Sequence, residues 1–156
     1  MFDNDWVDAA PFRTHLQHLL GVSRLPWRVL AVAANVPDRM VQRLLFESHH
    51  SLRRIRHIDA RHLMELTPQR LTQMDRSAVP AALARRQSLA LLAAGADRLE
   101  VAAFLGCTPQ ALRHLTDGRT SWCSAMMTAR AEAAARAHGV QDWAPINVPG
   151  EPGLAA

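Results

Sequence analysis

Two stretches of this chain repeat one pattern of small, turn-forming and apolar residues at a separation of 71 positions. The first stretch runs from Leu30 to Leu44 and the second from Val101 to Leu115. Two α-helices that cross at a tight turn need a small residue at their contact and a turn residue that tolerates positive φ. They also need apolar residues that hold the second helix against the first. Both stretches meet these requirements, so we predict the same pair of helices twice.

The residues at the constrained positions share their type between the two copies. Ala31 and Ala102 are the small residues at the helix crossing. Asn35 and Gly106 occupy the turn, where Asn and Gly adopt the left-handed conformation at the lowest cost. The turn plug and the buried side of the second helix are Val36, Val41 and Leu44 in the first copy and Cys107, Leu112 and Leu115 in the second. The pattern therefore predicts two helix-turn-helix motifs.

Helical periodicity covers most of the remaining chain, and we predict an all-α fold of roughly eight to nine helices. The expected helices span residues 9–20, 27–34, 37–46, 58–66, 67–74, 80–95, 98–105, 109–116 and 121–138, where the third starts at Pro37 or Asp38 and the last at Ser121 or Ser124. Asp8, Asp97 and Thr108 are expected to cap three of them. The only candidate strand, residues 51–57, places Leu52 and Ile55 out of phase for one buried face, so we predict no strand there.

The repeat also predicts how the chain is divided. We expect a first helix-turn-helix module over residues 1–66, a connector over 67–80, a second module over 81–138 and an irregular, Pro- and Gly-rich tail over 139–156. A module of about 60 residues buries only a thin core. We therefore expect the two modules to pack against each other in tandem.

The positive charge of the chain comes from arginine alone. All 18 basic residues are Arg and the formal net charge is +4. A GC-rich genome would favour Arg over Lys in almost any protein, but it would not decide where the Arg residues lie. Residues 11–66 carry nine Arg against four acidic residues, so a polyanion would be drawn to the first module. Double-stranded DNA is therefore the leading candidate partner.

The exposed positions of the second helix in each motif are candidates for reading bases, because this helix can lie in the major groove. Arg can bind guanine O6 and N7 together, and Gln can bind adenine N6 and N7, with about 1–3 kcal/mol of discrimination for each good pair. The candidates are Arg39, Gln42 and Arg43 in the first module and Gln110, Arg113 and His114 in the second. The first set is the stronger reader, and the alternative for both is a solvated helix face.

A dense basic cluster follows the first motif and is a candidate for phosphate contacts, which fix register without reading sequence. Two further Arg residues bracket the start of the motif. The candidates are Arg53, Arg54, Arg56 and Arg61 in the cluster, with Arg24 and Arg28 before it. Ordinary solvated charges are the alternative.

Other functional classes find little support in the sequence. His49, His50 and His57 lack the spacing of a zinc site, and no Ser-His-acid set, carboxylate pair or Gly-rich phosphate loop appears. We therefore expect no enzyme activity, no cofactor and no metal. Two cysteines, no signal sequence and no apolar run of about 18–20 residues favour a cytoplasmic, nucleoid-associated protein. The four tryptophans, Trp6, Trp27, Trp122 and Trp143, are expected to anchor helix packing rather than stack on bases.

The stretches Leu30–Leu44 and Val101–Leu115 resemble the helix-turn-helix motifs of bacterial and phage transcription regulators. The resemblance implies a sequence-specific DNA-binding regulator, with the first module dominant. Asn35 departs from the usual Gly of the turn, and the second reading helix is weakly basic. The alternative is a protein-interaction module, in which the second motif docks on a protein partner or forms a homodimer through Met126, Met127 and an Ala-rich face of Ala129, Ala133 and Ala137.

Overall fold

The computed structural model describes residues 5–46 and 52–139. The chain divides into two compact units, Met1–Gln73 and Met74–Ala156. Nine helices and two small sheets make up the described part, which confirms the all-α class. No helix in this part combines the length and the apolar composition that a membrane span requires. Residues 140–156, which include Trp143 and nearly all of the predicted tail, lie outside the described residues, as do His49 and His50.

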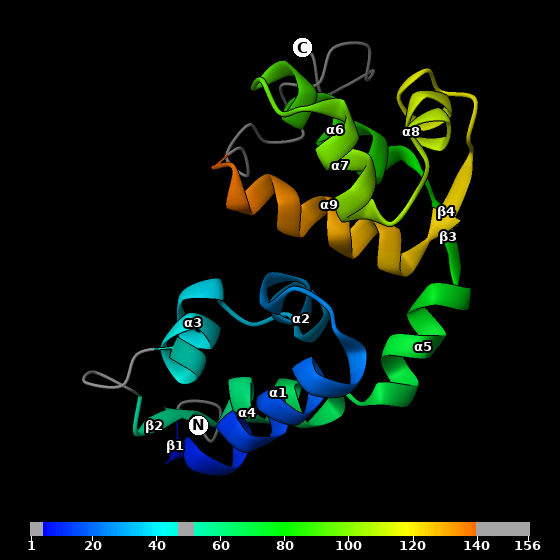
Figure 1. The fold of residues 1–156 in the computed structure, drawn as a ribbon. Coiled ribbons are helices and arrows are strands. Elements are labelled where there is room, and N and C mark those ends of the chain that lie inside the picture. Colours follow the sequence, from blue (N-terminus) through cyan, green and yellow to red (C-terminus); the bar gives the residue numbers. More distant parts are fainter. Residues whose placement is uncertain (1–4, 47–51, 140–156) are drawn as a thin grey trace, which may run out of the picture. The chain divides into compact units, whose positions relative to one another are not determined.

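The first unit consists of one two-stranded sheet and the helices that pack together beside it (Figure 1). Strand β1 (Trp6–Asp8) pairs antiparallel with β2 (Arg54–Arg56), which places Val7 opposite Ile55. In chain order the helices are α1 (Ala10–Ser23), α2 (Trp27–Ala34), α3 (Asp38–Phe46) and α4 (His57–Glu65), and α5 (Pro68–Arg76) runs across the boundary to the second unit. Helices α1 and α2 each pack against α3 and α4, so the core of this unit lies among these four helices.

The second unit has the same order of elements. Strand β3 (Ala78–Pro80) pairs antiparallel with β4 (Trp122–Ser124). The helices are α6 (Ala82–Ala93), α7 (Arg98–Leu105), α8 (Pro109–Thr116) and α9 (Ala125–Ala137). The core of this unit includes Leu91, Leu105, Leu112 and Leu115, packed with small alanines of α6, α7 and α9.

Matching backbone hydrogen bonds show that the two units share one frame. The N–H of Ala9 donates to the Arg53 carbonyl at 2.9 Å, and that of Ala81 donates to the Ser121 carbonyl at 3.0 Å. In each unit the bond joins the residue just before the first helix to the residue just before the second strand. The repetition therefore extends beyond the predicted motifs to a whole β-α-α-α-β-α arrangement.

The predicted turn geometry is confirmed in both units. Asn35 and Gly106 have φ values of 57° and 75°, in the left-handed region. The amide of Val36 donates to the Ala31 carbonyl at 3.1 Å, and the amide of Cys107 donates to the Ala102 carbonyl at 3.0 Å. Because Ala31 and Ala102 are also buried, the small residues lie where a tight crossing needs them.

The predicted caps are confirmed for α7 and α8. The Asp97 carboxylate accepts from the amides of Leu99 and Glu100 at 3.1 Å, and the Thr108 hydroxyl accepts from Ala111 at 3.0 Å. At α1 the N-cap residue is Ala9 rather than Asp8, because Asp8 pairs within the sheet, but the Asp8 carboxylate still accepts from the amide of Ala10 at 3.3 Å. Helix α1 passes through Gly21, where it was expected to end, and ends at Ser23, with Arg24 as its C-cap at a φ of 57°.

The prediction of no strand near residues 51–57 is also wrong. A three-residue strand needs only one inward side chain, and Ile55 is buried between the exposed Arg54 and Arg56. The packing of two tryptophans was likewise misjudged, because Trp6 is 55% exposed and Trp122 is 62% exposed. Both lie on three-residue strands, where side chains on the outer face have no helix to cover them.

The core side of α6 combines one leucine with small residues. Leu91 is fully buried with Ala84 and Ser88, whereas Leu89 is exposed. The small residues on α6 allow close packing against α9.

Candidate nucleic-acid interface

Helix α3 carries the predicted base-reading residues of the first module on its outer side. Met40, Val41 and Leu44 face the core and are buried. Arg39 and Gln42 are exposed, and Arg43 is half-buried at the border between the two faces. The helix therefore holds a polar, basic side toward solvent while its apolar side fixes it in the unit.

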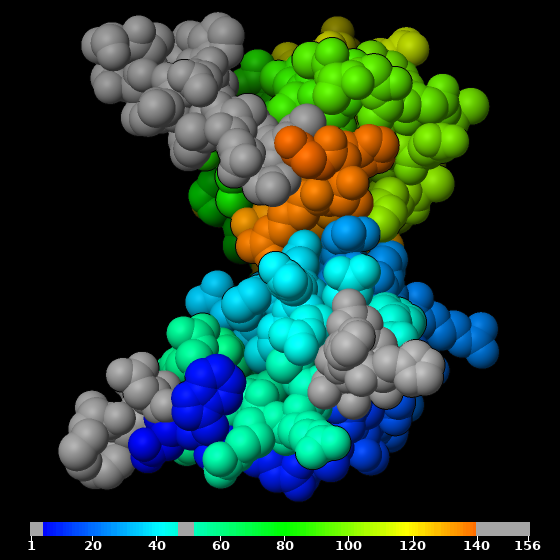
Figure 2. Space-filling model, turned by 90° about the vertical axis from the view of Figure 1, so that its left-hand side faces the viewer, coloured from blue at the N-terminus to red at the C-terminus, as the bar shows by residue number. Residues whose placement is uncertain are grey.

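A pocket of about 320 Å³ lies between α3 and the β1–β2 sheet. Its apolar lining comes from Trp6, Pro37, Met40, Leu52 and Ile55. Its basic lining comes from Arg39 and Arg43 of α3 and from Arg54 and Arg56 of β2. Figure 2 shows the blue β1 segment at the surface beside the blue-green β2 segment. The structure thus brings predicted base-reading and phosphate-binding residues to one basic pocket, which we call the α3–β2 pocket.

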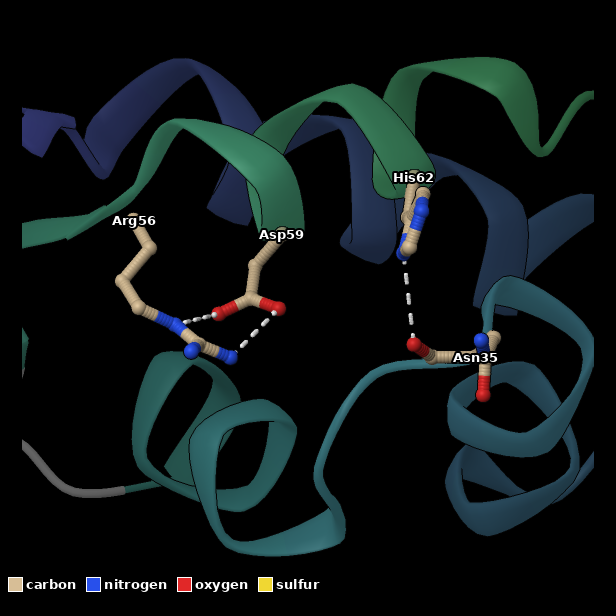
Figure 3. Close-up of polar contacts among 4 residues, drawn as sticks. All are labelled: Asn35, Arg56, Asp59 and His62. Atoms are coloured by element: carbon tan, nitrogen blue, oxygen red, sulfur yellow. Dashed lines mark hydrogen bonds and ion pairs between the residues drawn. The ribbon is translucent and has the colours of Figure 1, made fainter. Parts of the chain in front are cut away.

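Arg56 is bound to an acidic side chain that the sequence analysis did not single out. Its guanidinium donates to both carboxylate oxygens of Asp59, at 2.9 Å from Nε and 3.2 Å from Nη2 (Figure 3). This hydrogen bond, and then the charge of Asp59, raise the pKa of Arg56 above its usual value. The spacing of three residues at the start of a helix was the signal that could have predicted the pair. The Arg56 guanidinium is therefore held in one orientation, and its charge is balanced by Asp59.

Arg28 and Arg54 also have partners within the first unit. The Arg28 guanidinium lies 3.6 Å from an Asp38 carboxylate oxygen and 4.5 Å from the centre of the Trp27 ring. Arg54 donates to the backbone carbonyl of Trp6 at 3.4 Å, a long hydrogen bond that leaves the side chain exposed. Arg28 is thus held at the start of α2, whereas Arg54 is held only loosely beside Trp6.

The other three predicted phosphate contacts are exposed but do not line the α3–β2 pocket. Arg53 immediately precedes β2, Arg61 lies on α4, and Arg24 ends α1. Their positions are compatible with contacts to a long polyanion, but the structure does not gather them at one site.

Two side chains that the sequence analysis did not single out fix the helix pair of the first unit. Arg13 of α1 donates to the carbonyls of Leu44 at 2.7 Å and Leu52 at 2.8 Å, so it holds the last turn of α3 and the approach to β2. The ring Nδ1 of His62 lies 3.3 Å from the Asn35 carbonyl, as Figure 3 shows, and donates to it. These contacts set the position of α3 and its turn.

The second unit keeps equivalent supports. Arg85 of α6 donates to the Thr116 carbonyl at 3.4 Å, and Arg130 of α9 donates to the Phe104 carbonyl at 3.1 Å. The predicted readers of this unit lie on α8. Gln110 and Arg113 are exposed there, and His114 is half-buried.

The second unit does not keep the charges of the α3–β2 pocket. Its second strand places Trp122 and Ser124 where the first unit has Arg54 and Arg56. Gln110 takes the place of Arg39 on the second helix of the pair. The second unit therefore lacks the four Arg side chains that line the α3–β2 pocket of the first.

The described residues hold no group of three or more His, Cys, Asp or Glu side chains that could bind a metal ion. Comparison of the chain with protein-family models, with curated proteins and with solved structures finds no match.

Proposed function

We propose that the first unit binds double-stranded DNA and acts as a sequence-specific transcriptional regulator. In this proposal α3 enters the major groove, and β2 lies against the adjacent sugar-phosphate backbone. The supporting observation is the meeting of Arg39 and Arg43 of α3 with Arg54 and Arg56 of β2 at one pocket.

The environments of these side chains suggest different roles. Arg39 and Gln42 are exposed on α3, so their side chains can reach base edges. Arg43, at the border of the helix faces, would read a base at the edge of the same site. Arg54 on β2 and Arg53 just before it are exposed and suit phosphate contacts, which supply affinity but no sequence information. Arg56, already bound to Asp59, would contribute less to phosphate binding.

A salt titration tests the proposal. Binding of the full chain to mixed-sequence duplex DNA should weaken steeply with salt, because each neutralised phosphate releases counterions. Arg54→Ala should weaken binding to all sequences alike and lower the salt slope by about one. Arg70→Ala, on α5 and away from the α3–β2 pocket, is the matched control and should leave the slope unchanged. An absence of binding even at low salt would contradict the proposal.

A protein-docking role for the second unit is the second candidate. Its supporting observation is the exposed Trp122 on β4, at a position where the first unit has Arg54. Met126, Ala129 and Ala133, which the sequence analysis placed on the docking face, are buried. DNA footprints of the wild type and of the Gln110→Ala/Arg113→Ala variant separate the roles. Loss of one flank would indicate that both units contact DNA, and an unchanged footprint would favour docking or dimerisation.

A further inference from the structure

We propose that the α3–β2 pocket binds a single unpaired nucleotide, with the base against Trp6 and the phosphate between Arg39 and Arg54. The proposal shares Arg39 and Arg54 with the DNA-binding face proposed above, but it concerns a different ligand. A stacked base pair does not offer its ring face to a protein, whereas an unpaired nucleotide does.

The size and lining of the pocket fit a planar ring with an anionic group. Its volume of about 320 Å³ is at the lower end of ligand sites, which span about 300–1,000 Å³. Met40 and Ile55 are buried and provide an apolar floor that is already fixed by the core. This space suits one base with its sugar phosphate rather than a longer segment.

Trp6 is the stacking surface. Its side chain lines the pocket and is 55% exposed, although strand β1 holds its backbone against β2. Tryptophan beside a basic groove is a typical platform for unpaired bases, because every base has a ring face. A planar ligand that covers the ring would account for the position of this large apolar side chain at the surface.

The charges around Trp6 explain why the ligand should be an anion. Arg54 donates to the backbone carbonyl of Trp6, and both side chains line the pocket. Arg39 makes no hydrogen bond or ion pair with the residues that the structure describes and lines the same pocket. Asp59 also lines the pocket, but both of its carboxylate oxygens accept hydrogen bonds from Arg56, which balances its charge. An Arg pair of this kind suits a phosphate.

The second unit offers a control tryptophan. Trp122 is also exposed on a three-residue strand, but it stands where the first unit has Arg54, and Ala78 stands where the first unit has Trp6. Ser124 and Gln110 replace Arg56 and Arg39. The ring without the basic surroundings should not bind a nucleotide. Trp122→Ala therefore tests whether an exposed tryptophan alone is sufficient.

The experiment is a calorimetric titration of the full chain with deoxyguanosine monophosphate, with deoxyguanosine and with inorganic phosphate. The monophosphate should bind at least about tenfold more tightly than either fragment. Trp6→Ala should weaken it by about tenfold, in line with the loss of one base–aromatic stack, and Trp6→Phe should retain most of the binding. Arg54→Gln should weaken it severalfold, and Trp122→Ala should leave it unchanged. No binding of the monophosphate, equal binding of phosphate alone, or equal losses in Trp6→Ala and Trp122→Ala would overturn the proposal.

Binding to a blunt duplex and to a duplex with one unpaired nucleotide identifies the source of the nucleotide. The same measurements separate the nucleotide site from the proposed DNA-binding regulator. A Trp6-dependent preference for a duplex with one unpaired nucleotide over a blunt duplex would identify the DNA strand as the source. Monophosphate binding with no such preference would identify a free nucleotide, which would compete with duplex DNA for Arg39. Duplex binding without monophosphate binding would overturn only the nucleotide site. Monophosphate binding without duplex binding would overturn only the regulator proposal.

Discussion

Replacing Ala31 with leucine should destabilise the first unit, because no room for a larger side chain exists where α2 meets α3. Ala31 is fully buried, and its carbonyl accepts the Val36 amide at 3.1 Å, which fixes the turn tightly against the helix. Leucine would add three carbon atoms to this contact. Overpacking of this kind costs about 1–3 kcal/mol of unfolding free energy.

The loss should be visible in thermal unfolding followed by circular dichroism. For a unit of this size, 1 kcal/mol corresponds to about 4–8 °C in Tm, so we expect Ala31→Leu to lower Tm by about 5–20 °C. Ala102→Leu should have a similar effect on the second unit, where Ala102 is equally buried, whereas Ala103→Leu on the exposed side of α7 should not. A wild-type Tm for Ala31→Leu would show that the turn register is wrong by at least one residue.

Three further predictions follow from individual contacts. Asp97→Ala should lower the stability of the second unit by about 1 kcal/mol in urea unfolding, because the amides of the first turn of α7 lose their acceptor; an unchanged midpoint would contradict the cap. Arg13→Met should cost about 1.5–3 kcal/mol and weaken duplex binding, because the Leu44 carbonyl loses a charged donor and α3 loses its support; unchanged stability and affinity would refute this role. Burial raises the pKa of Cys107 because it disfavours the thiolate. In a Cys123→Ser variant, the alkylation rate measured against pH should therefore reach its midpoint above the ordinary thiol pKa of about 8.5. A midpoint at or below that pH would show that the thiol is not desolvated.

The helix pairs could be predicted from sequence because their constraints are local. The bounds of α2, the left-handed Asn35 and Gly106, and the caps Asp97 and Thr108 all depend on residues within one or two turns of each other. Turn and cap chemistry is expressed within such short distances.

The two sheets could not be predicted in the same way. β1 pairs with β2 across most of the first unit, and each strand has only three residues, which is too short for a period of two to show. The exposure of Trp6 depends on this pairing, so the interpretation of Trp6 as a packing anchor was wrong as well. The apolar part of the α3–β2 pocket was missed because it exists only when β1 is in place.

The basic part of the site was partly predictable. Arg39 and Arg43 follow from the helix period, and Arg54 and Arg56 follow from local charge density. Arg56 is paired with Asp59, and Arg28 is paired with Asp38, so these two guanidinium groups are less available to a ligand. The sequence gives the number of charged residues. Whether each of them can bind a ligand depends on neighbouring side chains that only the fold brings together.

The most direct test of the central claim is a comparison of base preference in the wild type, Arg39→Ala and Arg54→Ala, each measured on sites selected from a random duplex library and on mixed-sequence DNA. If α3 reads bases, Arg39→Ala should lose about 1–3 kcal/mol of preference at one or two base pairs and keep most of its affinity for mixed DNA. Arg54→Ala should weaken binding to both DNAs equally. Equal losses on both DNAs for the two variants, or no sequence preference in the wild type, would contradict the claim that α3 reads the major groove.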